Sequence, residues 1–189
     1  MKFELRHTFD GDLAAVEAAL LDPALPAYLK QHMKLVTEIA PLERQDEGET
    51  VRRRVRYVPV PLIQHIGPKK VPPGAMAWVE ESTYDRRAHR MEFRNISDHP
   101  KLRSLLDNSG TLSLHDLGGG RTERVVAGEL KVKVMLLGRI AEKIIHSEAE
   151  KILGEEAKVL NDFVKVRAGA GAGVGTGGGG GGGGGAEKA

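Results

Sequence analysis

The apolar residues alternate between strand spacing and helical spacing along this sequence, which we divide into three parts. Around residues 3–7, apolar and charged side chains alternate, as in a strand with one buried face. Residues 13–20 and 24–33 carry apolar residues at helical spacing, and Asp10 or Asp12 is in position to cap the first of these helices. We therefore expect one strand followed by two short helices at the start of the chain.

The second part, residues 34–134, has a spacing of two and predicts six strands joined as three hairpins. The expected strands cover residues 34–44, 50–58, 75–85, 89–96, 110–117 and 121–134. With the first strand they predict a curved seven-stranded antiparallel sheet that has one packed face and one face in water. Two connections, 58–74 and 97–109, are longer than turns, and both a lid and a simple cap on the end of the sheet fit them.

The third part, residues 135–167, returns to helical spacing and predicts one long helix. Its apolar arc consists of Leu137, Ala141, Ile145, Ala149, Ile152, Val159, Leu160 and Phe163. Glu156 lies near the middle of this arc, where a carboxylate needs a partner, water or a ligand. Because a helix cannot bury such a stripe alone, we expect the strands to curve around it, which gives an α+β fold.

Composition limits the domain organisation and the classes of function. The chain has 189 residues and becomes glycine-rich after Arg167, so we expect one domain at residues 1–167 and a disordered tail at 168–189. With 28 basic and 26 acidic residues, the charge is too balanced to indicate nucleic acid as a partner. The sequence has no cysteine, no nucleophile motif and no metal-ligand spacing among its seven histidines, so no metal or cofactor is expected. No apolar run approaches the length of a membrane span, and we expect a cytoplasmic protein.

The inward faces of the strands and of the long helix should line the interior of this fold. The apolar candidates for a ligand cavity are Val55, Tyr57, Met76, Trp78, Met91, Phe93, Ile145, Ile152 and Val159. Large, adaptable side chains of this kind suit an apolar pocket, and they suit an ordinary filled core as well. The pattern alone leaves both interpretations open.

Six charged residues allow two interpretations each. Arg53, Glu80 and Glu156 are expected to face inward, where they form either a polar set that orients a ligand or a structural ion pair at the rim of the cavity. A second set, Arg52, Arg54 and Arg56, is expected on the outer face of the same strand. These three arginines suit a transient contact with an anionic surface, and they equally suit a charged strand face in water.

Several short stretches connect the chain with a known superfamily. They are residues 3–5 leading into residues 12–16, Leu21-Asp22-Pro23, Gly110-Thr111-Leu112 before the hairpin at 118–122, and the final helix. In these stretches and in the order of its elements, the chain resembles the SRPBCC superfamily, also called START-like or Bet v 1-like, and within it a bacterial branch of unassigned function. The resemblance implies a helix-grip fold, in which a curved sheet encloses a hydrophobic cavity roofed by the last helix. Members of the superfamily bind lipids, sterols and polyketides, and some are cyclases or hydrolases.

Three functional hypotheses follow from the residues and this resemblance. The leading one is a non-catalytic binding or carrier protein for a hydrophobic small molecule or lipid, held between the sheet and the C-terminal helix. The second is an enzyme of the same fold, a cyclase or hydrolase acting on a hydrophobic substrate with polar groups of the pocket. The third is an interaction module that uses the basic strand.

Overall fold

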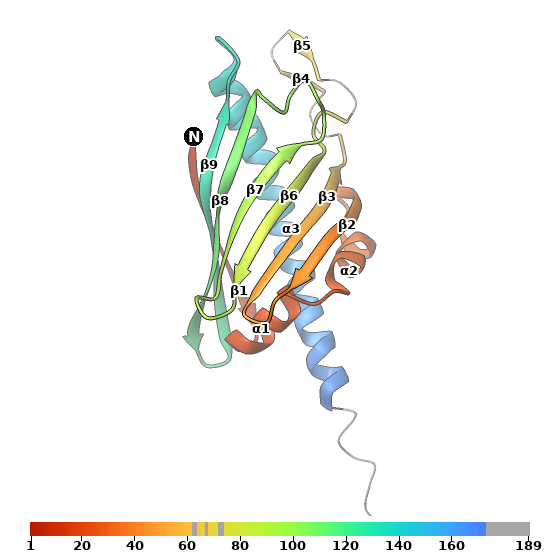
Figure 1. The fold of residues 1–189 in the computed structure, drawn as a ribbon, viewed down its shortest axis with the longest axis vertical. Helices are drawn as coiled ribbons and strands as arrows, with labels where there is room; N and C mark the ends of the chain where they lie inside the picture. The colour runs from red at the N-terminus through yellow and green to blue at the C-terminus, as the bar shows by residue number, and fades with distance from the viewer. Residues whose placement is uncertain (62–63, 67, 72–73, 173–189) are drawn as a thin grey trace, which may run out of the picture.

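In the computed structural model, a curved seven-stranded antiparallel sheet packs against one long C-terminal helix (Figure 1). The structure describes residues 1–61, 64–66, 68–71 and 74–172. The strands of the sheet are β1 (Lys2–Asp10), β2 (Val36–Asp46), β3 (Thr50–Pro59), β6 (Trp78–Asp85), β7 (Arg90–Ser97), β8 (Leu106–Gly118) and β9 (Arg121–Val132). The helices are α1 (Leu13–Leu20), α2 (Leu25–His32) and α3 (Gly138–Ala172). The predicted α+β helix-grip fold, with two short helices after the first strand, is confirmed.

The strand order is β1-β9-β8-β7-β6-β3-β2, so the six strands from β2 to β9 form a meander and β1 adds to its last member. β1 pairs with β9 along its whole length, from Lys2 opposite Glu129 to Asp10 opposite Arg121. Asp12 caps α1, because its carboxylate accepts a hydrogen bond of 2.8 Å from the backbone N–H of Ala15. α1 and α2 then lie beside α3 at one end of the sheet (Figure 1).

The main core lies at this end, between the sheet, α1, α2 and the C-terminal half of α3. Its fully or nearly fully buried members include Phe9, Val16, Leu20, Leu29, Val51, Tyr84, Leu160, Phe163 and Val164. In the N-terminal half of α3, Ile144, Ile145 and Ile152 are only half-buried. One half of the helix therefore completes a packed core, and the other half is packed less tightly against the sheet.

Some predicted boundaries differ from the structure. α3 begins at Gly138 and continues to Ala172, so residues 168–172, which were expected in the tail, are helical. Alanines favour helix, and each added residue extends an existing helix at little entropic cost, which explains the extension. β8 begins at Leu106, which shortens the expected connection at 97–109. The predicted disorder of residues 173–189 lies outside the described residues.

The long connection after β3 is also described only in part. Residues 62–63, 67 and 72–73 lie outside the described residues, so the lid and the end cap both stay open as interpretations. Within the described remainder, β4 (His65–Ile66) and β5 (Lys69–Lys70) form a small ladder separate from the main sheet. This ladder lies at the end of the molecule opposite α1 (Figure 1).

Two glycines permit the close approach of β8 and β9. Gly110 and Gly128 are opposite each other in the register of the two strands. A side chain on Gly110 would overlap the carbonyl oxygen of Ala127, and one on Gly128 would overlap the carbonyl oxygen of Ser109. The missing side chains also leave room for the rings of Phe93 and Phe3.

We predict that Gly110→Ala lowers the free energy of unfolding by about 1–3 kcal/mol, because the added methyl group forces backbone against backbone. Gly154→Ala is the matched control, since no heavy atom lies within 4 Å of the added carbon in the middle of α3. It should raise the free energy of unfolding by about 0.5–1 kcal/mol through its higher helix propensity. Urea unfolding measures both, and equal effects of the two substitutions would contradict the steric explanation.

Candidate functional site

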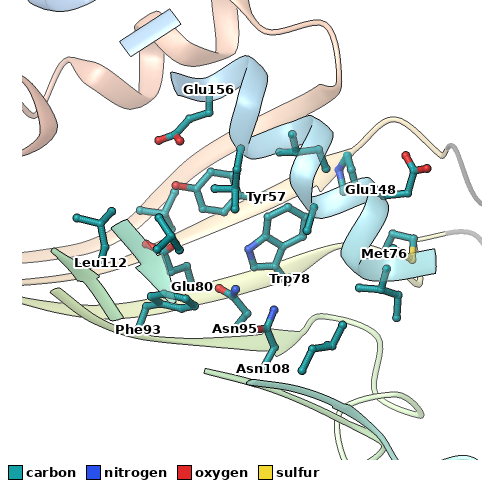
Figure 2. A pocket seen from close by; sticks show the side chains of 18 of the residues that line it. Tyr57, Met76, Trp78, Glu80, Phe93, Asn95, Asn108, Leu112, Glu148 and Glu156 are labelled. Carbon is teal, nitrogen blue, oxygen red and sulfur yellow. The ribbon is translucent and has the colours of Figure 1, made fainter. Parts of the chain in front are cut away.

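A cavity of about 220 Å³ lies between the inner face of the sheet and the N-terminal half of α3 (Figure 2). Its apolar wall on the sheet includes Val55, Tyr57, Trp78, Met91, Phe93, Leu112 and Val126. Its apolar wall on α3 includes Ile145, Ala149, Ile152 and Leu153. The interior at this end is thus a hollow, and residues such as Leu29 and Met91 belong both to its wall and to the adjoining core.

The structure brings together most of the predicted lining residues. Val55, Tyr57, Met76, Trp78, Met91, Phe93, Ile145 and Ile152 all line the cavity. Val159 does not, because it lies about two turns beyond Ile152 on α3, where the helix is already packed into the main core. The predicted inward faces of the strands therefore meet at one site, and the middle of the predicted helical arc, at Ile145, Ala149 and Ile152, faces it.

Two aromatic rings form a flat part of the wall. Tyr57 on β3 and Trp78 on β6 are directly opposite in the register, and their rings stack with centroids 5.2 Å apart and an interplanar angle of 14°. Figure 2 shows both rings between α3 and the sheet. Trp78 is the single tryptophan of the chain, so its fluorescence reports on the cavity.

A buried ion pair links the inner end of the cavity to α3. The guanidinium of Arg124 on β9 lies 2.7 Å from the carboxylate of Glu156, and its side chain is 1% exposed. The ring of Phe9 lies beneath this guanidinium at 5.4 Å, and the Nδ1 atom of His7 lies 3.4 Å from it. The partner of Glu156 is therefore Arg124, a residue that the sequence analysis did not select. Its position in β9, two residues before the inward Val126, was the signal that could have identified it.

Arg53 lines the same end of the cavity but has a different environment. Its guanidinium donates a hydrogen bond of 3.0 Å to the carbonyl oxygen of Leu20 and contacts the sulfur of Met91 at 3.3 Å. Its Nε atom is buried and has no hydrogen-bond partner among the described residues. Within the part of the chain that the structure describes, no carboxylate oxygen lies within 4 Å of this group, so the ion pair that was one of two interpretations of the inward charged residues does not form at Arg53. Glu156 instead forms its ion pair with the more deeply buried guanidinium of Arg124.

Glu80 and Tyr57 also line the end of the cavity that contains Arg53 and Arg124, which we call its polar end. Burial raises the pKa of Glu80, and the negative charge of Glu156 adds to this, while Arg53, a hydrogen bond with Ser82 and Arg124 oppose it. Burial also raises the pKa of Tyr57 well above its usual value, with a further contribution from Glu80. Both groups therefore have raised pKa values at the end of the cavity that Arg53 lines.

A pair of amides lies between the polar end and Trp78. Asn95 on β7 and Asn108 on β8 are opposite each other, and both line the cavity (Figure 2). Their Oδ1 atoms are buried and have no hydrogen-bond partner among the described residues. The sequence analysis missed both, although Asn95 shares the inward spacing of Met91 and Phe93. These amides can offer a bound molecule a second polar contact.

The outer arginines of β3 each have acidic partners. Arg52 lies 2.9 Å from Glu47, Arg54 lies 3.2 Å from Glu81, and Arg56 lies 2.7 Å from both Glu38 and Asp98. Their charges are thus balanced locally on the outer face of the sheet. Elsewhere, none of the described residues form a cluster of three or more potential metal ligands, and none of the described helices is long and apolar enough to cross a membrane.

The sheet, the long helix packed against it and the cavity between them define a helix-grip fold. Three solved structures share this fold at low sequence identity, which establishes the fold alone. TTHA0849 from Thermus thermophilus is 19% identical, with a TM-score of 0.63 over 89% of this chain and 99% of that chain. Norcoclaurine synthase from Thalictrum flavum is 14% identical, with a TM-score of 0.62 over 87% of this chain and 86% of that chain. A START superfamily protein from Mycobacterium smegmatis is 16% identical, with a TM-score of 0.52 over 88% of this chain and 98% of that chain.

The chain belongs to the DUF2505 family, which is described as a protein of unknown function and whose model matches residues 4–164. No curated protein matches the sequence. The family match covers the sheet, the two short helices and most of α3.

We predict that Glu156→Leu lowers the free energy of unfolding by about 3–5 kcal/mol, because it leaves the charge of Arg124 buried without its partner. Adding Arg124→Met should recover much of this loss, since the pair is then replaced by apolar groups. Glu150→Gln, an exposed change on the same helix, should alter the free energy of unfolding by no more than about 0.5 kcal/mol. Urea unfolding of the four proteins decides the matter, and a double variant as unstable as Glu156→Leu alone would contradict the role of the pair.

The raised pKa of Glu80 predicts a pH dependence of stability. Between its usual pKa and the raised one, the folded protein binds more protons at this site than the unfolded chain, so the free energy of unfolding falls as pH rises. Glu80→Gln removes this titration, and its stability relative to the wild type should improve from about pH 4 to about pH 8. Glu81→Gln, on the outer face, controls for the loss of one negative charge. A constant difference between Glu80→Gln and the wild type across this range would show that the pKa of Glu80 is not raised.

Proposed function

We propose that this protein is a non-catalytic carrier that binds a small, mainly apolar molecule with a carboxylate at one end. The observation that supports this best is a cavity with apolar and aromatic walls that ends at Arg53, a guanidinium with no carboxylate partner among the described residues. Ligand sites of proteins are commonly apolar hollows with a few polar groups that fix orientation.

The volume of the cavity limits the size of the molecule. At about 220 Å³ it falls below the roughly 300–1,000 Å³ that is common for ligand sites. A short aliphatic or single-ring compound is therefore a better match than a sterol or a two-chain lipid.

The charges at the inner end favour an anionic group on the ligand. Arg124 has the carboxylate of Glu156 as its partner at 2.7 Å, whereas no carboxylate of the described residues lies within 4 Å of the Arg53 guanidinium. Arg53 remains as a positive charge whose present contacts are a carbonyl oxygen and a sulfur. A carboxylate would accept charge-assisted hydrogen bonds from this guanidinium, and such bonds are stronger than neutral ones.

A second candidate is an enzyme that uses the same cavity for acid–base chemistry. Glu80 is the specific observation in its favour, because a carboxylic acid with a raised pKa in an apolar site is suited to proton transfer. Norcoclaurine synthase shows that an enzyme can have this fold. Mass spectrometry of a ligand recovered after incubation separates the two: unchanged ligand supports the carrier, and a product that disappears in Glu80→Gln supports the enzyme.

The basic outer strand supports neither candidate. Because Arg52, Arg54 and Arg56 already have carboxylate partners, an anionic surface would have to compete with those pairs. Surface ion pairs are weak individually, so a contact of low affinity would be the expected result.

We predict that octanoic acid changes the fluorescence of Trp78 and that Arg53→Gln weakens its binding by about 10- to 100-fold, the loss typical of a charged hydrogen bond. Octanol, which has the same chain and no charge, should bind equally to both proteins. Arg52→Gln is the matched control, since it removes the same charge from the outer face one residue away.

The outcomes separate the two parts of the proposal. If octanoic acid and octanol both bind and Arg53→Gln affects the binding of neither, the carrier function is supported. The proposed binding of a carboxylate by Arg53 is then wrong. If neither compound changes the fluorescence of Trp78, the cavity does not bind short apolar molecules and the carrier proposal fails.

A further inference from the structure

We propose that the connection between β9 and α3 docks on the surface of an anionic lipid bilayer. It carries Met135 and Leu136, which are 88% and 93% exposed, and Ile140 at 48% follows in the first turn of α3. Single exposed apolar residues are ordinary, but adjacent large ones at a projecting tip are not. A bilayer is the partner that would bury such a tip without needing a shaped groove.

The backbone holds this tip outward. Leu136 has a φ of +65°, a conformation that is uncommon for a large side chain and that glycine or asparagine would adopt more easily. On either side the chain is fixed, because the N–H of Lys133 donates to Leu105 and the N–H of Gly138 donates to Val134, both at 2.8 Å. A large apolar side chain is thus presented to solvent at a position where a small polar residue would fit the backbone better.

The charges around the tip complement anionic headgroups. Lys131, Lys133, Arg139 and Lys143 are all exposed, whereas Glu142 is the single acidic residue in the segment 131–143. Glu142 is occupied, since its carboxylate accepts hydrogen bonds from the N–H of Val132 at 3.0 Å and from the amino group of Met1 at 3.4 Å.

The four basic residues differ in their partners. Lys133 pairs with Asp107 at 2.7 Å and Lys131 lies 3.8 Å from Glu129. Arg139 and Lys143 have no carboxylate within 4 Å in the described part of the chain. Basic groups beside an apolar tip are the combination that binds anionic membranes.

The position of the tip relates the proposed membrane contact to the cavity. β9 ends at the same end of the molecule as the β4–β5 ladder, opposite α1 (Figure 1). The cavity extends toward this end, where Met76, Ala77 and Leu106 line it. Docking would bring that end of the cavity to the lipid bilayer, in which apolar molecules concentrate. This purpose rests on the proposed carrier function, but the exposed tip and its charges do not.

Sedimentation with vesicles tests the contact. The full chain should bind vesicles of equal parts phosphatidylcholine and phosphatidylglycerol, bind pure phosphatidylcholine vesicles much less, and dissociate as salt is added. Met135→Ser combined with Leu136→Asn should lower binding by about tenfold or more, because the inserted apolar surface is lost. Arg139→Gln combined with Lys143→Gln should lower binding to the mixed vesicles and reduce its dependence on salt.

Leu117→Asn is the matched control, since Leu117 is 47% exposed at the opposite end of β8. Absence of binding to the mixed vesicles would overturn the proposal, and so would equal binding by the control and by the variant of Met135 and Leu136. The Trp78 titration with octanoic acid distinguishes the two proposals. If the wild type binds octanoic acid but not vesicles, the carrier proposal is supported and the docking proposal is wrong. If it binds vesicles but not octanoic acid, only the docking proposal is supported.

Discussion

The structure depends on how the apolar stripe of α3 is covered. A helix of 35 residues cannot be buried along its whole length by two helices of eight residues each. α1 and α2 lie beside its C-terminal half, and the N-terminal half covers a cavity lined by the sheet and by residues such as Leu20 and Leu29 of the short helices. In the C-terminal half of α3, the close packing of Leu160, Phe163 and Val164 forms part of the core. A cavity remains under the N-terminal half of α3. The same apolar stripe therefore stabilises the domain at one end and lines the cavity at the other.

Buried charges at the junction of these halves differ in how they are satisfied. Arg124 is held by Glu156 and by the ring of Phe9, and this ties β1, β9 and α3 together. Among the described residues, the hydrogen-bond partners of the Arg53 guanidinium are the carbonyl oxygen of Leu20 at the end of α1 and the sulfur of Met91. The first arginine has a carboxylate partner within the protein. The second keeps part of its hydrogen-bonding capacity within the cavity, which is why the ligand proposal centres on it.

Much of this organisation could be predicted from the sequence because alternation along a strand fixes which side chains share a face. That rule placed Tyr57, Trp78 and Phe93 inward, and it would also have placed Arg124 and Asn95 there. It does not give the distances between faces. The choice of Arg124 over Arg53 as the partner of Glu156 depends on where α3 crosses β9, which is set by packing over the whole domain. The end of α3 was missed for a different reason, since glycine content suggested a tail while the alanines and the existing helix sustained another turn.

The pairing of β1 with β9 has a consequence for how the domain folds. Lys2 lies opposite Glu129, so the edge of the sheet that is synthesised first finds its neighbour only after nearly all other strands have been made. Contacts between residues so far apart in sequence close large loops and slow folding. On the ribosome, the six strands of the meander can pair in order as they emerge, while β1 has to wait with an unpaired edge. Such an edge can pair with another chain, so this period is when the nascent protein is most prone to aggregation and most dependent on chaperones.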